Sequence, residues 1–316
     1  MSERQHVVVL AGGLSHERDV SLRSGNRVAD AMREAGLDVV VRDVDAALLP
    51  ALRAEPPAVV VPMLHGATGE DGSVRDVLEL LGLRYVGSRP QACRLAFDKL
   101  SAKVWVAAAG VATPRSVALP QSAFRELGAT VVMAALTDAL GLPLMVKPTW
   151  GGSSLGAAVV RTAEELPAAM VGCFAYGDTA LVEQFVSGCE IAVSLVDTEH
   201  GPAALPLVEV VPDGGIYDYA ARYTAGTTEF FVPARLDELT AQACRDTALR
   251  AHNALGLRDL SRTDLIVDDA GVCWFLEVNV APGMTETSLF PQAVAAAGQD
   301  IGGMWRRLVD RAAGRG

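Results

Sequence analysis

The sequence predicts a mixed α/β (α+β) fold with three domains, and three observations support this prediction. Residues 1–88 alternate between short apolar strands and amphipathic helices, which is typical of a Rossmann-like parallel sheet covered by helices. A second strand-rich unit contains a glycine-rich loop, and from about residue 190 the strands follow one another as in an antiparallel sheet. Because 316 residues exceed one compact core, we place the domains at residues 1–88, 89–186 and 187–316.

The N-terminal domain begins with an apolar strand that a tight glycine turn joins to a helix. The pattern predicts strands over residues 6–10, 39–44 and 58–64, and helices over residues 20–35 and 76–81. Gly36 and Gly82 follow the two helices, as glycine often does at a helix C-terminus. Ser15, Asp19 and His65 follow the first and third strands, at the edge where α/β sheets bind ligands. The alternative interpretation gives the first two a helix-capping role and the histidine a structural one.

The central domain is predicted to open with one long helix over residues 89–110, which carries Lys99 and Lys103. A lysine on a helix surface is usually solvated, so Lys99 is less distinctive from the sequence alone. The remaining elements are predicted as strands at residues 116–119, 144–147, 157–161 and 180–185, and helices near 122–140 and at 163–171. Glu183 and Glu190 flank the last strand end, where a solvated loop and a functional role fit equally well.

The loop at residues 149–156 holds three glycines around Ser153 and Ser154. Backbone N–H groups in such a loop can surround a phosphate, although the P-loop and Rossmann fingerprints are both incomplete here. An ordinary hairpin tip is the alternative. Lys147 favours the phosphate interpretation, because it lies in the apolar strand just before the loop, where a buried ammonium needs an anionic partner.

The C-terminal domain is predicted to contain strands at residues 191–196 and 204–211, an irregular segment at 212–232, a helix at 237–255, a hairpin, and a last helix from Ala293 onward. The irregular segment holds Tyr217, Tyr219 and Tyr223, three of the five tyrosines in the chain. This concentration predicts a loop that closes over a ligand. A surface loop anchored by aromatic packing is the alternative.

The hairpin after residue 260 carries the strongest chemical signal. If Ala270 and Gly271 form its tip, Asp264 lies opposite Glu277 and Arg262 lies opposite Asn279. Residues two apart on a strand share a face, so two carboxylates, an amide and a guanidinium gather on one patch. Oxygen ligands of this kind suit Mg²⁺. Charges paired across a solvated hairpin are the competing interpretation, but apolar neighbours suggest a buried element, and buried carboxylates need a partner.

Composition limits the classes of function. A net charge of −11 argues against nucleic acid as a partner, since binding a phosphate backbone needs a basic surface. No signal-peptide pattern and no apolar run long enough to span a bilayer are visible, so we expect a cytoplasmic protein without a membrane partner. The five cysteines are scattered, so the sequence predicts reduced thiols and neither a disulfide framework nor a zinc site.

A series of motifs, in order and spacing over about residues 7 to 300, resembles the D-alanine–D-alanine ligases of the ATP-grasp superfamily. They are Gly-Gly-x-Ser-x-Glu17-Arg-x-Val-Ser, His65-Gly-x-x-Gly-Glu-Asp-Gly, Asp98-Lys99, Val-Lys147-Pro, Gly-Ser153-Ser, Tyr217-Asp-Tyr-x-Ala-x-Tyr223, Arg262-x-Asp264, Glu277-x-Asn279 and Pro-Gly283-Met-Thr. The resemblance implies a three-domain ATP-grasp fold with ATP between the central and C-terminal domains. It also implies that the γ-phosphate of ATP activates one D-alanine carboxylate, which the amine of a second D-alanine then attacks.

The resemblance implies a role for each matching residue. The residues implied to bind the phosphates of ATP are Lys99, Lys147, Ser153, Ser154 and Arg222, and those implied to bind the rest of the nucleotide are Glu183, Gln184, Phe185, Val186 and Glu190. Two Mg²⁺ ions, or Mn²⁺ in their place, would be bound by Asp264, Glu277 and Asn279. The oxyanion would be contacted by Arg262 and the Gly283 N–H. The first substrate is assigned to Glu17, His65 and Tyr217, with Ser153 and Tyr223 closing the loop on Glu17, and the second to Ser288 and Leu289. A homodimer is implied as well.

The chain departs from the family pattern at three places. Arg222 stands where the family usually has lysine, Val280-Ala281 replaces a threonine-containing pair, and Trp150 is unusual in the phosphate loop. Two alternatives therefore stay open. One is a ligase with another acceptor, a different D-amino acid or a hydroxy acid, although Tyr223 argues against the hydroxy acid. The other is a nucleotide-binding protein without turnover, which the complete set of metal-site and lysine residues argues against.

Overall fold

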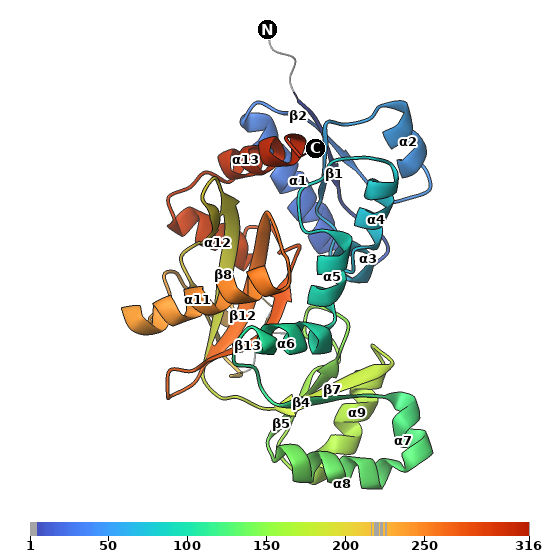
Figure 1. Cartoon of the computed structure of the whole chain (residues 1–316), viewed down its shortest axis with the longest axis vertical. Helices are drawn as coiled ribbons and strands as arrows, with labels where there is room; N and C mark the ends of the chain where they lie inside the picture. The colour runs from blue at the N-terminus through green and yellow to red at the C-terminus, as the bar shows by residue number, and fades with distance from the viewer. Residues whose placement is uncertain (1–4, 216, 218–220, 222–223, 225, 316) are drawn as a thin grey trace.

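A computed structural model gives the fold of the protein and describes residues 5–215, 217, 221, 224 and 226–315. It contains three sheets with helices packed around them (Figure 1). Among the described helices, none combines the length and apolar character needed to cross a membrane. The predicted α/β (α+β) fold class is confirmed, with one parallel and two antiparallel sheets.

The N-terminal sheet is parallel, as predicted, with strand order β2-β1-β3. Its strands are β1 (His6–Leu10), β2 (Asp38–Arg42) and β3 (Val59–Pro62), and its helices are α1 (Arg18–Glu34), α2 (Leu48–Ala54), α3 (Ala67–Glu70) and α4 (Ser73–Leu80). The short helix α3 is not predicted from the sequence. It begins after Gly66, whose φ of +81° favours glycine, and it places Glu70 beneath the end of β3.

The central sheet is antiparallel and has the order β4-β7-β5-β6. Its strands are β4 (Ser116–Pro120), β5 (Leu144–Pro148), β6 (Ala158–Val160) and β7 (Thr179–Gln184). The helices α7 (Gln121–Leu127), α8 (Ala129–Leu140) and α9 (Leu166–Phe174), with a 3₁₀ turn at Ala163–Glu165, accompany it. The buried apolar cluster against this sheet is built entirely from residues 124–182, so this sheet has a core of its own.

The C-terminal sheet has the order β11-β10-β8-β12-β13, with β9 paired to β8. Its strands are β8 (Cys189–Thr198), β9 (Gly201–Ala204), β10 (Val208–Pro212), β11 (Thr228–Phe231), β12 (Leu260–Val267) and β13 (Cys273–Asn279). The helices are α11 (Glu238–Ala254), α12 (Leu289–Ala296) and α13 (Ile301–Ala313). The helices α5 (Pro90–Phe97) and α6 (Lys99–Ala108) contribute buried residues to the core under this sheet.

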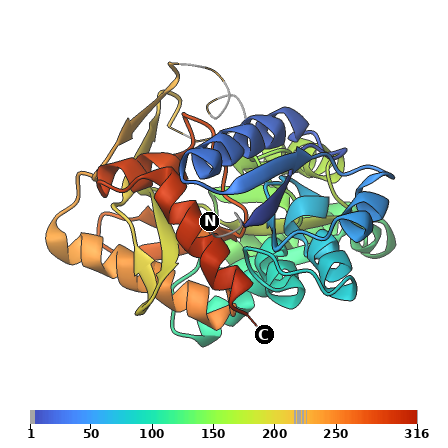
Figure 2. The ribbon, with the colours of Figure 1, turned by 90° about the horizontal axis from the view of Figure 1, so that it is seen from above.

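The N-terminal and C-terminal sheets share one apolar core. Val7 and Val59 of the parallel sheet and Val196 and Leu260 of the antiparallel sheet belong to the same buried cluster, together with Trp305 of α13. Seen from above, α13 runs between the two sheets and close to α1 (Figure 2). The last helices of the chain therefore join its first and last sheets.

Two predicted helices are each divided in the structure. The expected helix at residues 89–110 breaks at Asp98, whose extended backbone ends α5 and whose side chain accepts a hydrogen bond from Leu100 N as the N-cap of α6. The expected helix near residues 122–140 breaks at Gly128, with a φ of +90°. The last helix also begins earlier than predicted, because α12 starts at Leu289 and α13 follows it after Gly298.

Two strand predictions are wrong in detail. The expected strand at residues 204–211 is interrupted after β9, because Pro206 has no N–H for the ladder, and β10 begins at Val208. The segment at residues 212–232 was expected to be irregular, but its end forms β11, which pairs with β10.

Candidate active site

Two adjoining pockets form one cleft between the sheets. The smaller, of about 150 Å³, lies between α1, α3 and the C-terminal sheet. The larger, of about 860 Å³, lies between the central and C-terminal sheets. The residues that line both are Lys99, Gly151, Gly152, Tyr217 and Glu277. A ligand group in one pocket can therefore approach a ligand in the other.

The hairpin β12–β13 forms one wall of the cleft with the predicted register. Arg262 pairs with Asn279 and Asp264 pairs with Glu277. The loop is nevertheless odd, since Val267 pairs with Cys273, and a β-bulge beyond Asp264 makes up the difference. The assumed turn is thus wrong by one residue while the pairing of the site residues is right.

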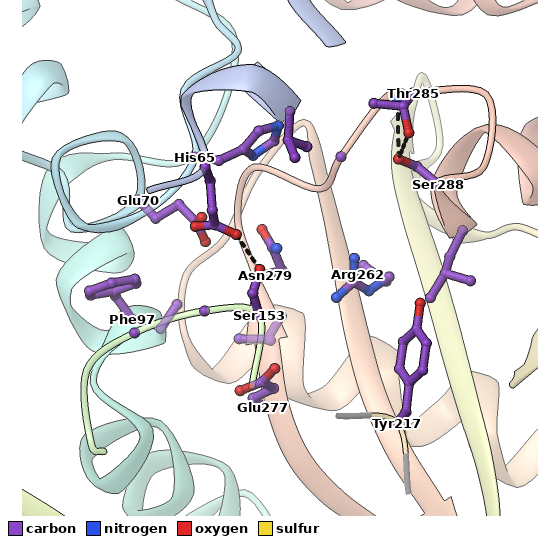
Figure 3. A pocket seen from close by; sticks show the side chains of 18 of the residues that line it. His65, Glu70, Phe97, Ser153, Tyr217, Arg262, Glu277, Asn279, Thr285 and Ser288 are labelled. Atoms are coloured by element: carbon purple, nitrogen blue, oxygen red, sulfur yellow. Dashed lines mark hydrogen bonds between the residues drawn. The ribbon is translucent and has the colours of Figure 1, made fainter. Parts of the chain in front are cut away.

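The bulge falls on Leu276, which has no partner on β12. Phe275 before it belongs to the core behind the sheet, whereas Leu276 and Glu277 both line the larger pocket. Figure 3 shows Glu277, Asn279 and Arg262 on adjacent strands below the segment that carries His65 and Glu70. The polar face of the hairpin therefore points into the cleft.

Arg262 and Asp264 form a bidentate ion pair. Arg262 Nε donates to Asp264 Oδ1 at 2.7 Å and Nη2 donates to Oδ2 at 2.8 Å. Both residues are buried. Burial lowers the pKa of the guanidinium, but Asp264 and then Glu277 outweigh it, so the pKa of Arg262 is raised overall. The guanidinium is a fixed cation at the floor of the smaller pocket.

Lys99 sits at the junction of the two pockets because the helix break at Asp98 makes it the first residue of α6. Its Nζ lies 3.2 Å from Glu277 Oε2 and donates to Gly151 O at 2.6 Å. Its backbone N–H donates to Thr149 O at 3.0 Å. The missed helix break is what directs this ammonium toward the glycine-rich loop.

Lys147 of β5 and Glu183 of the neighbouring strand β7 form an ion pair. Lys147 Nζ lies 2.5 Å from Glu183 Oε1, and Lys103 Nζ lies 2.7 Å from Glu183 Oε2. Burial raises the pKa of the carboxyl, but the two lysines outweigh it and hold the pKa below its usual range. Glu183 is therefore a buried carboxylate that two ammonium groups share.

The glycine-rich loop places two serines in the left-handed region, Ser153 at φ +55° and Ser154 at φ +57°. Ser153 Oγ donates a short hydrogen bond to Glu17 Oε1, and Ser154 Oγ donates to Tyr217 O at 3.1 Å. The loop is thus fastened on one side to the first turn of α1 and on the other to the segment before β11.

Glu17, His65 and Glu70 form the N-terminal side of the smaller pocket. His65 Nε2 lies 3.3 Å from Ser24 Oγ, and its pKa is lowered because burial outweighs the attraction of Glu17. Glu70 Oε1 accepts a hydrogen bond from Gly66 N at 2.9 Å. Burial, and next the negative charge of Glu17, raise the pKa of Glu70 to about 8. Its surroundings therefore favour the protonated form of this carboxyl group.

The opposite side of the smaller pocket is the segment after β13. Gly283, Ser288 and Leu289 line it. Ser288 Oγ accepts from Thr285 N at 3.0 Å and lies 2.8 Å from Thr285 Oγ1. Arg27 of α1 donates to Met284 O at 2.9 Å, so the N-terminal helix holds this segment in place.

The sequence-predicted residues that the structure describes line one or both of the two pockets, and Ser153 and Asn279 line only the smaller one. The larger pocket is lined by Lys99, Lys147, Ser154, Glu183, Gln184, Phe185, Val186, Glu190, Asp264 and Glu277. The smaller is lined by Glu17, His65, Ser153, Tyr217, Arg262, Asn279, Gly283, Ser288 and Leu289. Tyr223 and Arg222 lie outside the described residues. Trp150 packs edge-on against Phe97, with ring centroids 5.6 Å apart.

Sequence reasoning missed Glu70 in the cleft and Lys103 directly behind it. Glu70 belongs to the motif that begins at His65, but its burial was not foreseen because helix α3 was not. Lys103 lies one helical turn after Lys99, and only its pairing with Glu183 distinguishes it from a solvated lysine. The signal for Lys103 was its position in an otherwise apolar stretch of α6.

The donor set at the hairpin fits a hard divalent ion. Two carboxylates, Asp264 and Glu277, lie directly opposite each other, and the amide of Asn279 follows on the same face. Its Oδ1 already accepts from Ala281 N at 2.8 Å. Among the described residues no group of three His, Cys, Asp or Glu side chains could hold a metal, so an ion here would need further ligands from phosphate and water, as Mg²⁺ commonly does.

Comparisons with known proteins agree in sequence and in fold. A family model described as "D-ala D-ala ligase C-terminus" matches residues 105–310. The D-alanine--D-alanine ligase of Anaeromyxobacter sp. (strain K) is 40% identical over 309 residues, covering 98% of this chain and 97% of the relative. A D-alanine--D-alanine ligase of Bacillus anthracis complexed with ATP superimposes with a TM-score of 0.82 at 27% identity, covering 98% and 97%. The VanG D-Ala:D-Ser ligase of Enterococcus faecalis superimposes with a TM-score of 0.84 at 25% sequence identity. The match covers 98% of this chain and 100% of that ligase.

Proposed function

The chain belongs to the D-alanine–D-alanine ligase family, and we propose which step of the ligation each of its two pockets serves. The enzyme is an ATP-grasp ligase that joins two D-alanines for peptidoglycan precursor synthesis. The larger pocket holds ATP and the smaller holds the two amino acids. The observation that carries this proposal is the register of the hairpin. Asp264 and Glu277 face the nucleotide side, and Arg262 lies two residues away on the same strand, at the floor of the substrate side.

In the larger pocket Lys99 and Lys147 bind the phosphates of ATP, and the loop that carries Ser153 and Ser154 covers them. Both lysines already neighbour carboxylates, Lys99 at Glu277 and Lys147 at Glu183. The segment from Glu183 to Val186 contacts the adenine base, and Glu190 binds the ribose. Arg222 is assigned a further phosphate contact by its position in the sequence.

Asp264, Glu277 and Asn279 would hold Mg²⁺, with Mn²⁺ as a substitute, and such ions would neutralise the phosphate oxygens as the γ-phosphoryl group leaves ADP. The protein contributes the two opposed carboxylates and the neighbouring cations, which hold the donor oxygens in fixed positions.

In the smaller pocket Glu17 binds the ammonium of the first D-alanine, and His65 and Tyr217 complete its site. The carboxylate oxygen of this D-alanine attacks the γ-phosphorus, ADP leaves, and an acyl phosphate forms. The amine of the second D-alanine then attacks the acyl carbon, and after it loses a proton the C–O bond breaks and phosphate departs. Arg262 and the Gly283 N–H stabilise the oxyanion of that tetrahedral intermediate. Ser288 and Leu289 bind the carboxylate of the second substrate.

The loop that carries Ser153 excludes water from the acyl phosphate. Its hydrogen bond to Glu17 links loop closure to the residue that binds the first substrate. Tyr223 is the third member of this group by its place in the sequence motif.

We also propose the domain limits 1–88, 89–186 and 187–316, a homodimer and a cytoplasmic location. The separate core at residues 124–182 supports a central unit, whereas the helices α5 and α6 at the start of the range 89–186 pack into the core under the C-terminal sheet. The family's usual association through its N-terminal domain supports the dimer.

The test is direct. The purified protein is incubated with ATP, Mg²⁺ and D-alanine, and phosphate release is measured together with dipeptide by mass spectrometry. We expect one D-alanyl-D-alanine per phosphate, and background release with L-alanine. Phosphate release at background with D-alanine would overturn the assignment.

A second acceptor is supported by the likeness to the VanG D-Ala:D-Ser ligase. The acceptor side of the pocket carries the hydroxyls of Thr285, Thr287 and Ser288, which could hydrogen-bond a serine side chain. Competition between D-alanine and D-serine at equal concentration measures this directly. A product ratio above about ten to one for D-alanyl-D-alanine excludes the D-serine alternative.

A further inference from the structure

Lysine is confined to three positions in this chain. Of 27 basic residues only Lys99, Lys103 and Lys147 are lysines, so 27 − 3 = 24 are arginines. Lys99 and Lys147 line the proposed nucleotide pocket. Lys103 lines neither pocket, and its side chain is only 2% exposed. Since the chain uses arginine at its 24 other basic positions and lysine elsewhere only in the proposed nucleotide pocket, a buried lysine at residue 103 indicates a need for a compact ammonium.

The ammonium of Lys103 lies directly behind the nucleotide pocket. Its Nζ is 2.7 Å from Glu183 Oε2 and donates to Thr113 Oγ1 at 2.6 Å. Thr113 in turn donates to Phe275 O at 3.0 Å, just before the bulge of β13. Lys103 therefore connects the central sheet with the hairpin.

The charge count of this cluster explains what Lys103 contributes. If Glu183 met Lys147 alone, the two charges would cancel, and the ammonium that faces the pocket would attract phosphate only weakly. With Lys103 on the other oxygen, two ammonium groups share one carboxylate and the cluster carries one positive charge. In a buried site an uncompensated charge of this kind acts strongly on an anion nearby.

We propose that Lys103 is a positioning residue for ATP, which shares Glu183 with Lys147 so that the charge of Lys147 remains available to the phosphates. The proposal rests on the proposed function only in that the larger pocket binds ATP.

The proton affinities of the two lysines support these different roles for Lys103 and Lys147. Burial, and with it the nearby charge of Lys147, outweighs the attraction of Glu183 and lowers the pKa of Lys103 to about 8. Burial also lowers the pKa of Lys147, but Glu183 and then Glu277 outweigh it, so its pKa is raised overall. Lys103 is thus the member of the pair that loses its proton first as pH rises.

The test measures ATP affinity by calorimetry in the full-length protein with Mg²⁺. Lys103→Met should weaken ATP binding roughly ten- to hundredfold, because one partner of a buried charge cluster is lost. The double variant K103M/E183Q restores one net positive charge and should bind ATP more tightly than K103M. A merely structural role predicts the reverse order, since two losses would add. A double variant that binds more weakly than K103M overturns the proposal.

Thr113→Val is the matched control, because it removes the contact of Lys103 to the hairpin without changing any charge. We expect it to change ATP affinity less than about threefold, and an effect equal to that of K103M would overturn the proposal.

If K103M does not fold, the wild-type protein still provides a test. Its ATP affinity should fall as pH rises through about 8, where Lys103 is neutralised while Lys147 keeps its proton. Affinity that does not change from pH 7 to 9 would count against the proposal. Wild-type protein that binds no ATP at all would instead overturn the proposed function.

Discussion

Arg262 and Asp264 hold each other in a bidentate pair although their proposed ligands lie in different pockets. The arginine is assigned to the oxyanion of the substrate, and the aspartate to the metal ions at the phosphates. Because the two side chains are buried two residues apart on β12, each fixes the position of the other. The geometry of the metal site and that of the oxyanion site are therefore coupled through one strand.

Asp264→Asn should destabilise the fold as well as weaken the metal site. It leaves the buried guanidinium of Arg262 without its counter-charge, which costs about 3–5 kcal/mol in comparable buried pairs. The measurement is the free energy of unfolding in urea. Asp30→Asn is the control, since Asp30 pairs with Arg33 on an exposed helix face and should cost less than about 1 kcal/mol. Equal losses in the two variants would contradict the prediction.

Ser153→Ala should lower kcat/KM for dipeptide formation by roughly ten- to a hundredfold, because a hydrogen bond to a charged group contributes about 1.5–3 kcal/mol. Ser153→Gly removes the same hydroxyl but accepts the φ of +55° without strain, so it separates the two effects. We expect the two variants to lose similar activity and the glycine variant to be the more stable. Steady-state kinetics with D-alanine as the varied substrate measures the first effect. Full activity in Ser153→Gly would show that the bond to Glu17 is not used.

Glu70 should make stability depend on pH. Its pKa in the folded protein is about 8, above the ordinary 4.5, so the folded state binds more protons than the unfolded state between these values. The stabilisation is complete below about pH 4.5 and is lost as pH rises through about 8. Glu70→Gln imitates the protonated carboxyl and should flatten this dependence. Urea unfolding at pH 6 and pH 9 should show a loss on the order of a few kcal/mol in the wild type and a smaller one in the variant. Parallel losses would refute the assignment.

Arg315→Ala should loosen the contact between the segment after α13 and Asp259, the residue just before β12. Arg315 pairs with Asp259, which is fully buried and also accepts from Gly87 N at 2.6 Å. Since the arginine is partly exposed, we expect a loss of about 1–3 kcal/mol in unfolding free energy. Arg311→Ala is the control, because its contact to Asp197 is longer, at 3.5 Å, and more exposed. A larger loss in the control would contradict this ranking.

The sequence was most informative where local periodicity and chemistry agreed. The pairing of Asp264 with Glu277 followed from the pairing expected of a hairpin whose tip lies at Ala270 and Gly271, and the glycine-rich loop at residues 149–156 was visible as clustered glycines around two serines. The helix break at Asp98 was missed because helix propensity is continuous there, and only the capping bonds of Asp98 reveal it. The capping residue nevertheless decides where Lys99 points.

The other misses depend on contacts between distant segments, which a periodic pattern does not contain. Glu70 is buried beside Glu17, from which it is separated by two strands and two helices in sequence. Lys103 is distinguished from a surface lysine only by Glu183, 80 residues later in the chain. In both cases the residue itself was visible, but its neighbours depend on how the sheets come together.

Because of the bulge, the apolar side chain of Leu276 lies next to the acidic side chain of Glu277 on the same face of β13. A regular strand presents only every second residue to one face, so an acidic and an apolar neighbour would point in opposite directions. Here the extra residue lets Leu276 and Glu277 line the same pocket, which suits a ligand that is an aromatic base at one end and a polyanion at the other.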